Sequence, residues 1–327
     1  MLLEASEVAL PLSALQQFVK GRAEGDLLPW SAQVEASRRF GVSVADVELG
    51  ALEAGVLPKR YQRNRTTISV EDQLVLFRSR AGVIGCGGLG GYIVEELSRV
   101  GVGHLALVDP DVFEEHNLNR QLLSSPELVG TAKVEAARAR VAAVNPAVTV
   151  AASRVALSAG NARELLAGCS IVVDALDNVL TRRELAATCR ELSVPFVHGA
   201  IAGWFGQVSV QMPGGDILPL LRPTAEGKGV ETTLGNPSFT PAVVASLQAA
   251  EAVKVLLGRG RPLAARVLLA GRRRVNALSV GRRVGLVSHF GSVTQPPSPE
   301  TFRDHEASRR LAGSSGACIP ARSRPPG

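Results

Sequence analysis

A glycine-rich loop begins the stretch of this chain whose residue types and spacing could support chemistry. It reads Gly85-Cys86-Gly87-Gly88-Leu89-Gly90. Glycines let a phosphate approach the backbone closely, and a helix that starts at such a loop offers free N–H groups and a positive dipole end. The loop therefore predicts a nucleotide site. It fits NAD, FAD, S-adenosylmethionine and ATP equally, and its candidate binding residues are Gly85, Gly87, Gly88 and Gly90.

Polar residues downstream of the loop discriminate among these ligands. They are Asp109, Asp111, Asn117, Arg120, Gln121 and Lys133. Asp109 ends the next predicted strand, where a carboxylate can accept hydrogen bonds from ribose hydroxyls. Arg120 and Lys133 bring two cations to the nucleotide side of the sheet. Hydride transfer develops no charge on phosphate, whereas cleavage between the α- and β-phosphates does and needs cations there. The pair favours chemistry on the phosphates.

An alternation of strand and helix patterns predicts the elements that must position these side chains. Apolar strands are expected at 81–84, 105–108, 171–173 and 195–197, and helices from the glycine loop to about 100, over 133–144 and over about 180–192. This order predicts a doubly wound, Rossmann-like and mostly parallel sheet with helices on both faces. After Gly199 the pattern changes to antiparallel strands at 207–211, 265–270 and 275–280, with a helix from an N-cap at Thr240 to Leu257.

Three zones are predicted along the chain. Residues 1–58 form a small N-terminal helical segment with helices near 12–21, 31–40 and 43–54 and no good strand. We expect this segment to pack against the main domain, because it has no obvious DNA-recognition helix. Residues 59–285 form the nucleotide-binding domain. Residues 286–327 are rich in Pro, Ser, Gly and Arg and are predicted to be disordered.

Composition and charge exclude several classes of protein. The 327 residues contain no apolar run of membrane-spanning length and no signal peptide, so a cytoplasmic protein without a membrane partner is expected. The four cysteines lie far apart, which argues against a disulfide framework. Residues 259–327 hold 13 Arg, no Lys and three acidic residues, so the net charge of +6 leaves about −4 for the remainder by subtraction. No aromatics are interleaved with the clusters Arg272-Arg273-Arg274 and Arg282-Arg283, and no nucleic-acid partner is expected.

The motifs together resemble the ThiF/MoeB/HesA family, the adenylyltransferase superfamily that activates ubiquitin-like proteins. The resemblance covers about residues 60–280. The matching residues are Arg60-Tyr61-x-Arg63, the glycine loop, Val100-Gly101-Val102-Gly103, Asp109-x-Asp111, Asn117-Leu118-x-Arg120-Gln121, Val129-Gly130-x-x-Lys133-Val134, Asn145-Pro146, Asp174-x-x-Asp177-Asn178, Gly206-Gln207-Val208 and Ser246-Leu247-Gln248-Ala249-x-Glu251-Ala252-x-Lys254.

The resemblance implies a reaction and a set of residue roles. The family binds ATP and Mg²⁺ and attaches AMP to the C-terminal Gly-Gly carboxylate of a ubiquitin-like partner. By that resemblance Asp109 holds the ribose, Asp177 coordinates Mg²⁺ with Asn178 beside it, and Arg63 reaches the ATP of the other subunit of a homodimer. The residues that line the phosphates would be Asn117, Arg120, Gln121 and Lys133. Asp177 follows a predicted strand, at the sheet edge where doubly wound folds bind ligands.

Two departures from the family pattern narrow the prediction. Many members carry two Cys-x-x-Cys pairs that bind zinc, one of which would fall near 216–219 and the other after 280. Neither is present, so no zinc is expected. Many members also have a cysteine before the helix at Pro241, where this chain has Thr232 and Thr233. Threonine is not ionised at neutral pH, so adenylation without a covalent transfer step is favoured.

The leading prediction is a homodimeric, ATP- and Mg²⁺-dependent adenylyltransferase acting on a sulfur carrier of the ThiS or MoaD type, in thiamine, molybdenum or tungsten cofactor synthesis or a related sulfur-transfer pathway. Three alternatives stay open. One is a ThiF-like enzyme that adenylates a small molecule, a peptide or a tRNA base. Another is an NAD-binding oxidoreductase, which leaves Arg120, Lys133 and Asp177 unexplained. The last is a non-catalytic binding subunit, against which the same three residues argue.

Overall fold

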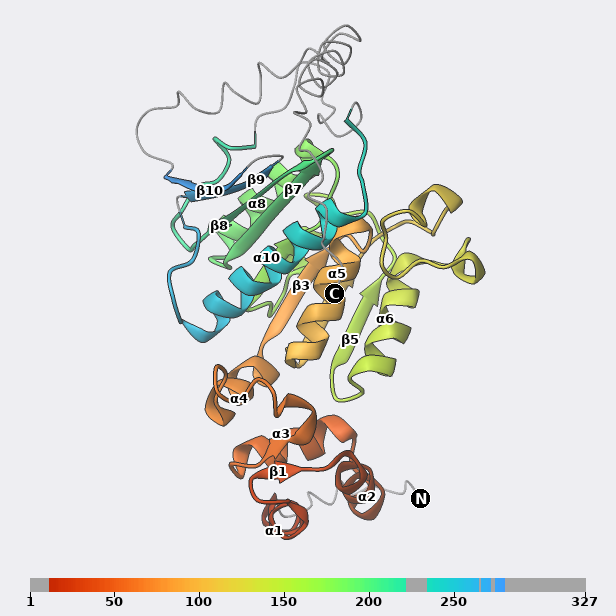
Figure 1. Cartoon of the computed structure of the whole chain (residues 1–327), viewed down its shortest axis with the longest axis vertical. Helices are drawn as coiled ribbons and strands as arrows, with labels where there is room; N and C mark the ends of the chain where they lie inside the picture. The colour runs from red at the N-terminus through yellow and green to blue at the C-terminus, as the bar shows by residue number, and fades with distance from the viewer. Residues whose placement is uncertain (1–11, 222–233, 265, 272–273, 280–327) are drawn as a thin grey trace, which may run out of the picture. The chain divides into compact units, whose positions relative to one another are not determined.

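The computed structural model describes residues 12–221, 234–264, 266–271 and 274–279, and it describes side chains in residues 14–221 and 234–264. Its centre is an eight-stranded sheet in the order β10-β9-β8-β7-β6-β3-β4-β5 (Figure 1). The strands are β3 (Arg80–Ile84), β4 (His104–Val108), β5 (Thr149–Ser153), β6 (Ile171–Asp174), β7 (Phe196–Ala202), β8 (Phe205–Gln211), β9 (Arg266–Gly271) and β10 (Arg274–Ser279). Strands β5, β4, β3, β6 and β7 are parallel, and β8, β9 and β10 are added antiparallel. The predicted fold class is confirmed.

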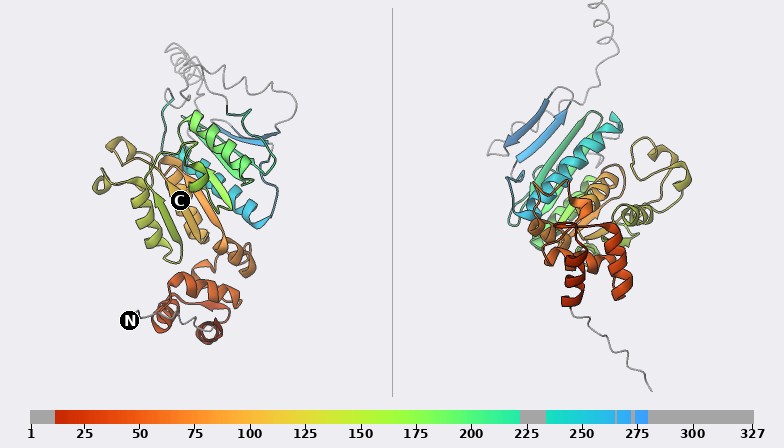
Figure 2. Two further views of the ribbon diagram at one scale, coloured as in Figure 1. Left: turned by 180° about the vertical axis from the view of Figure 1, so that it is seen from behind. Right: turned by 60° about the horizontal axis from the view of Figure 1, so that its bottom comes forward.

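Helices cover both faces of this sheet because successive strand residues point to opposite sides. Val83 of β3 packs in one core cluster with the helices α5 (Gly88–Val100), α6 (Lys133–Val144) and α10 (Phe239–Leu257). Its neighbour Ile84 packs in a second cluster with α8 (Val179–Glu191), which is the green helix in front of the sheet in Figure 2, left. The short helix α7 (Ala162–Leu165) lies before β6 in the chain.

Helix ends follow the predicted capping signals closely. Gly101 ends α5 and Gly258 ends α10, each in the left-handed conformation, with φ of 85° and 61°. Helix α6 spans the predicted residues. The N-cap of α10 is Ser238 and not Thr240, because the Thr240 hydroxyl instead donates a hydrogen bond of 2.7 Å to the carbonyl of Gly203.

The N-terminal residues form three helices and one short strand pair. The helices are α1 (Leu12–Arg22), α2 (Trp30–Phe40) and α3 (Val44–Glu53), and Ser43 caps α3 with Asp46 in a capping box. The strands β1 (Leu27–Leu28) and β2 (Leu57–Pro58) pair in parallel, so the expectation of no strand before residue 58 is wrong. Two residues per strand are too few to give a periodic pattern.

A fourth helix, missing from the sequence prediction, connects this segment to the sheet. Helix α4 (Val70–Arg78) begins at a second capping box, in which Ser69 and Asp72 cap each other's backbone. Three single-turn helices complete the described elements: η1 (Lys59–Tyr61), η2 (Glu115–Asn117) and η3 (Pro126–Leu128). The predicted tail at 286–327, the threonines at 232–233 and the second position at which relatives carry zinc ligands all lie outside the described residues.

One described helix, α10, is long and apolar enough to pass a simple test for a membrane span, with 19 residues and a mean hydropathy of 1.3. The sequence analysis expected no apolar segment of membrane-spanning length, and α10 is one described helix that passes this test. Yet Val244, Ala245 and Ala252 of α10 are buried in the core cluster that also holds α5 and the sheet. Its apolar composition is explained by packing inside the domain.

Candidate functional site

A cavity of about 580 Å³ opens at the carboxyl edge of the parallel strands. Its walls include the ends of β3, β4 and β6, the starts of α5, α6 and α8, and the segment 155–157 that follows β5. This volume lies in the range of small-molecule sites, and the edge is the one at which doubly wound folds bind ligands. Ten of the predicted site residues line the cavity: Gly85, Gly87, Gly88, Asp109, Asp111, Arg120, Gln121, Lys133, Asp177 and Asn178.

The glycine loop is built for close approach of the backbone. Gly85 has a φ of 99°, and a Cβ there would lie 2.5 Å from the carbonyl oxygen of Ala175. A Cβ on Gly90 would lie 1.9 Å from the carbonyl oxygen of Gly85, although Gly90 itself does not line the cavity. Gly90 therefore lets α5 start directly beneath the loop, while Gly85, Gly87 and Gly88 face the space above it.

Asp109 lies at the end of β4 with its carboxylate turned toward the loop. It accepts hydrogen bonds from the backbone N–H groups of Cys86, at 2.7 Å, and Asp111, at 2.8 Å. Burial raises the pKa of this carboxyl, and the two backbone donors oppose that rise. Burial also raises the pKa of the Cys86 thiol, which lies inside the core and outside the cavity lining. Cys86 is thus a packing residue and not a nucleophile.

Two cationic side chains line the cavity, and only one of them pairs with a carboxylate among the described residues. The Lys133 side chain is buried, and its Nζ donates a 3.0 Å hydrogen bond to Asp111. Arg120 donates through Nη1 to the carbonyl of His116 and to Asn119, at 3.0 and 2.9 Å, and pairs with no carboxylate among the residues that the structure describes. Its charge is therefore uncompensated, which favours an anionic ligand.

The turn that carries Arg120 is fixed by Asn117. Asn117 is buried, its Oδ1 accepts a 3.0 Å hydrogen bond from the backbone N–H of Glu114, and it does not line the cavity. Gln121 does line the cavity, and its Oε1 atom is buried without a hydrogen-bond partner. An orphaned buried acceptor of this kind indicates a missing donor at the cavity wall.

Asp177 and Asn178 follow β6 on the opposite wall. Asp177 is exposed, lines the cavity and makes no hydrogen bond or ion pair with any described residue. Asn178 caps α8 by accepting hydrogen bonds from the N–H groups of Leu180, at 2.8 Å, and Thr181, at 3.1 Å. Asn178, and not Asp174, is therefore the cap of this helix.

Asp174 is instead the centre of a buried network that sequence reasoning missed. It is fully buried and accepts a 2.7 Å hydrogen bond from His198 Nδ1, while Arg182 Nε lies 3.3 Å from the same oxygen. Burial lowers the pKa of the His198 imidazole, so the ring is neutral at pH 7, and Gln207 Nε2 contacts its Nε2 atom at 3.1 Å. Arg182 and Asn236 also line the cavity, and Asn236 Oδ1 is buried without a partner.

Arg63 does not line this cavity. It is exposed on the turn that follows η1 and makes no hydrogen bond or ion pair with the described residues. The structure therefore brings all the predicted side chains together except those of Asn117 and Arg63.

Donor atoms for a metal ion are few among the described residues. No group of three or more His, Cys, Asp or Glu side chains that could hold a metal occurs within the described ranges. A single free carboxylate, that of Asp177, fits a Mg²⁺ ion that takes its other ligands from phosphate oxygens and water. The expectation of no zinc stays a prediction, because the second position at which relatives bind it lies outside the described residues.

Comparison with known proteins identifies relatives of the chain. A model of the ThiF family matches residues 61–280. The chain is 40% identical over 214 residues to the SAMP-activating enzyme E1 of Haloferax volcanii, an alignment that covers 64% of this chain and 79% of that protein. It is also 40% identical over 221 residues to the sulfur carrier protein adenylyltransferase of Thermus thermophilus, covering 64% and 82%. The solved structure of E. coli MccB with ATP superposes with a TM-score of 0.58 at 20% identity, over 70% of this chain and 74% of that one, which shows the fold alone.

Proposed function

The chain belongs to the ThiF family and is an adenylyltransferase of the ubiquitin-activating type, and we propose that it uses ATP to adenylate the C-terminal Gly-Gly carboxylate of a ubiquitin-like sulfur-carrier protein. The relatives named for activation of SAMP and for adenylylation of a sulfur carrier protein support this class of partner. A carrier of the ThiS or MoaD type fits, and the proposal extends to any carrier that ends in Gly-Gly.

One observation carries the proposal. A cavity at the glycine loop combines an uncompensated Arg120, a buried Lys133 and a free carboxylate at Asp177. A cavity that binds a dinucleotide for hydride transfer needs none of these three, whereas phosphoryl transfer needs cations at the phosphates and a carboxylate for the metal.

The reaction requires alignment and charge neutralisation more than acid–base chemistry. A carboxylate oxygen of the carrier attacks the α-phosphorus of ATP, the bond from that phosphorus to the bridging oxygen breaks, and the electron pair leaves with pyrophosphate. No proton is transferred, because the nucleophile is already ionised. The protein must hold two anions together and stabilise charge that shifts onto the leaving group.

The lining residues divide this work. N–H groups of the loop at Gly87 and Gly88 and the N-terminus of α5 face the phosphates, whereas the N–H of Gly85 already donates to the carbonyl of Val108, at 2.8 Å. Asp109 accepts the ribose hydroxyls. Arg120 and Lys133 lie where charge develops, with Asp111 orienting Lys133.

Three further residues support this arrangement. The Oε1 atom of Gln121 has no partner and is available to accept a hydrogen bond from the ligand. Asn178 caps α8. Asn117 fixes the turn that carries Arg120 by accepting a hydrogen bond from the backbone N–H of Glu114. None of them carries a net charge, so their contribution is to positioning.

The remaining roles concern the metal and a second subunit. Asp177 would hold Mg²⁺, which neutralises phosphate charge when bound. Arg63 cannot serve the cavity of its own chain, which it does not line, so we assign it to the cavity of a second copy in a homodimer.

The test is exchange of labelled pyrophosphate into ATP, measured with the protein and a Gly-Gly-ended carrier. Asp177→Ala should reduce the exchange rate by about 10³-fold or more. Asp216→Ala is a matched control, because Asp216 is also an exposed aspartate and does not line the cavity. It pairs with Arg190 at 3.3 Å and accepts a 2.9 Å hydrogen bond from the backbone N–H of Leu218. The proposal fails if no exchange occurs with carriers of either type, or if the two variants behave alike.

A further inference from the structure

Arg63 and the cavity lie at opposite edges of the sheet. The turn of Arg63 is joined to η1, and the hydroxyl of Tyr61 in η1 sits beside Gly101, where a Cβ would approach it to 2.6 Å. Gly101 lies just before β4 begins at His104, so this contact marks the amino edge of the parallel strands. The cavity is at the carboxyl edge, a strand length of about 17 Å away. Helix α5 runs between the two edges, with the glycine loop at its start and Gly101 at its end.

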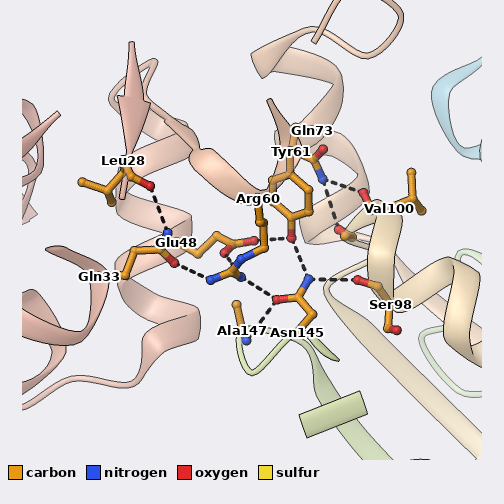
Figure 3. A network of polar contacts seen from close by, with 11 residues as sticks. Leu28, Gln33, Glu48, Arg60, Tyr61, Gln73, Ser98, Val100, Asn145 and Ala147 are labelled. Carbon is orange, nitrogen blue, oxygen red and sulfur yellow. Dashed lines mark hydrogen bonds and ion pairs between the residues drawn. The ribbon is translucent and has the colours of Figure 1, made fainter. Parts of the chain in front are cut away.

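A buried polar network holds the start of the turn (Figure 3). Tyr61 donates its hydroxyl to Glu48 Oε1, at 2.7 Å, and accepts from Asn145 Nδ2, also at 2.7 Å. Arg60 donates through Nη1 to Glu48 Oε2, at 2.7 Å, and to Asn145 Oδ1, at 2.5 Å, and through Nη2 to Gln33, at 2.7 Å. The Glu48 side chain is fully buried, and Tyr61 is 1% exposed.

This network joins the N-terminal helices to the nucleotide-binding fold. Gln33 comes from α2 and Glu48 from α3, whereas Asn145 ends α6 and donates a second hydrogen bond of 2.9 Å to the carbonyl of Ser98 in α5. A planar guanidinium and an amide with fixed partners on three helices permit few alternative positions. The network therefore fixes the backbone at residues 60–61, directly before the turn that carries Arg63.

The rest of the turn is equally well fixed, apart from Arg63. The backbone N–H of Asn64 donates to the carbonyl of Tyr61, at 2.8 Å, and that of Ile68 to the carbonyl of Asn64, also at 2.8 Å, after which Ser69 caps α4. Arg65 pairs with Asp26 at 3.0 Å. Arg63 stands between these contacts, exposed and without a partner in the described part of the chain, on a backbone held at both ends.

We propose that residues 12–58 are a platform that presents Arg63 to the cavity of a second copy of the chain, with Glu48, Arg60 and Tyr61 as positioning residues for Arg63. This inference rests on the proposed function. It gives the N-terminal helices a part in the reaction, since a side chain that must reach a neighbouring subunit gains from a base that does not move. Small displacements of such a group are costly, on the order of 10²-fold in rate per ångström.

Mixed dimers test the proposal. Two variants are co-expressed with different tags, and dimers that hold one copy of each are isolated. In a dimer of Arg63→Ala with Asp177→Ala, one site of the two combines an intact cavity with an intact Arg63, so about half of the wild-type exchange rate should return. Arg65→Ala is the control for Arg63→Ala, because it removes a neighbouring exposed arginine from the same turn.

Glu48→Gln then shows what the platform does. Its homodimer should lose on the order of 10²-fold in rate. Paired with Asp177→Ala it should regain about half of the wild-type rate, since the Asp177→Ala copy supplies a well-placed Arg63. Paired with Arg63→Ala it should stay inactive, because neither copy presents Arg63 correctly. A variant that harms its own cavity would give the opposite pattern. Tyr61→Phe, which removes a single hydroxyl, repeats the test if Glu48→Gln does not fold.

The outcomes separate the two proposals. Absence of exchange by the wild-type protein overturns the proposed function. Exchange by the wild type without recovery in the Arg63→Ala and Asp177→Ala pair overturns the assignment of Arg63 to a second copy. Recovery in that pair, together with an inactive Glu48→Gln and Asp177→Ala pair, overturns the platform alone. Thermal unfolding, sedimentation and calorimetric titration with ATP establish that Glu48→Gln remains folded, dimeric and able to bind the nucleotide.

Discussion

The two edges of the parallel strands differ in whether their charged side chains are paired. At the amino edge, the fully buried Glu48 pairs with the partly buried Arg60, and Tyr61, Asn145 and Gln33 form hydrogen bonds with this pair (Figure 3). At the carboxyl edge, the charges of Arg120 and Asp177 have no opposite partner among the described residues, and the acceptor of Gln121 is unused.

This difference separates a structural role from a binding role. Buried charges persist in a fold when they are paired and hydrogen-bonded, as at the amino edge. Polar groups that a fold leaves unpartnered around a cavity are available to a ligand, and they contribute nothing to stability until it arrives. Variants of the amino-edge network should therefore change stability or position. Variants of Arg120 and Asp177, the unpaired charges at the carboxyl edge, should change activity with little effect on stability.

After Asp177→Ala, the largest effect is expected for Arg120→Ala. Removing an unpaired cation from the phosphates should lower the rate of pyrophosphate exchange by about 10² to 10³-fold. The midpoint of thermal unfolding should hardly move, since no ion pair is lost. Arg138→Ala is the matched control, because Arg138 is an exposed arginine of α6 that pairs with Glu135 and does not line the cavity. Equal rates for the two variants would contradict the role of Arg120.

Glu48→Ala tests the amino edge by stability. It leaves the Arg60 guanidinium partly buried beside Tyr61 without its carboxylate, which should lower the free energy of unfolding by about 3 kcal/mol. Asp177→Ala should change that free energy by no more than about 0.5 kcal/mol. Denaturant unfolding of both variants checks the contrast. A larger loss of unfolding free energy in Asp177→Ala than in Glu48→Ala would contradict the division into a structural amino edge and a ligand-binding carboxyl edge.

A pH dependence of intermediate size is expected from His198. Burial lowers the pKa of its imidazole, and the hydrogen bond to Asp174 opposes that fall. The unfolded chain therefore binds the proton first as the pH drops below about 6.5. The free energy of unfolding should decrease through that pH by at most about 1.4 kcal/mol per pH unit, until the folded protein is protonated too. His198→Gln should remove this dependence of the unfolding free energy on pH. Urea unfolding measured between about pH 5 and 8, the range in which histidine changes charge, checks it. His116→Gln, at an exposed histidine, should keep this dependence.

The smallest effect is expected for Arg65→Ala. Its ion pair with Asp26 is exposed on both sides, so its loss should change the free energy of unfolding by less than about 0.5 kcal/mol. The rate of exchange should stay unchanged. A large loss of activity would show that the turn needs both of its exposed arginines and would weaken the distinction drawn for Arg63.

Much of the fold and of the cavity could be predicted from the sequence because local signals specify them. Buried strands that end in Asp109 or shortly before Asp177 place their polar residues at one edge, and glycine at 101 and 258 ends two helices by its left-handed backbone. The region that resembles the family coincides closely with the matched residues 61–280.

Other features could not be predicted because they depend on contacts distant in sequence. Asp174 and His198 are 24 residues apart and meet only when β6 and β7 pair. Arg60 and Asn145 are 85 residues apart, so no periodic pattern connects them. The N-terminal helices were expected to pack against the main domain, but their link to Arg63 depends on Gln33 and Glu48, which look like ordinary helix-surface residues in the sequence.

Intact-mass measurement of a Gly-Gly-ended carrier after incubation with the protein, ATP and Mg²⁺ tests the central claim most directly. The carrier should gain the mass of one adenylyl group, which is AMP less one water, with the wild-type protein and with Asp216→Ala, and no mass with Asp177→Ala. A carrier whose last glycine is removed should not be labelled either. Consumption of ATP with no gain of mass on the carrier, or equal labelling by the Asp177→Ala variant, would contradict the account.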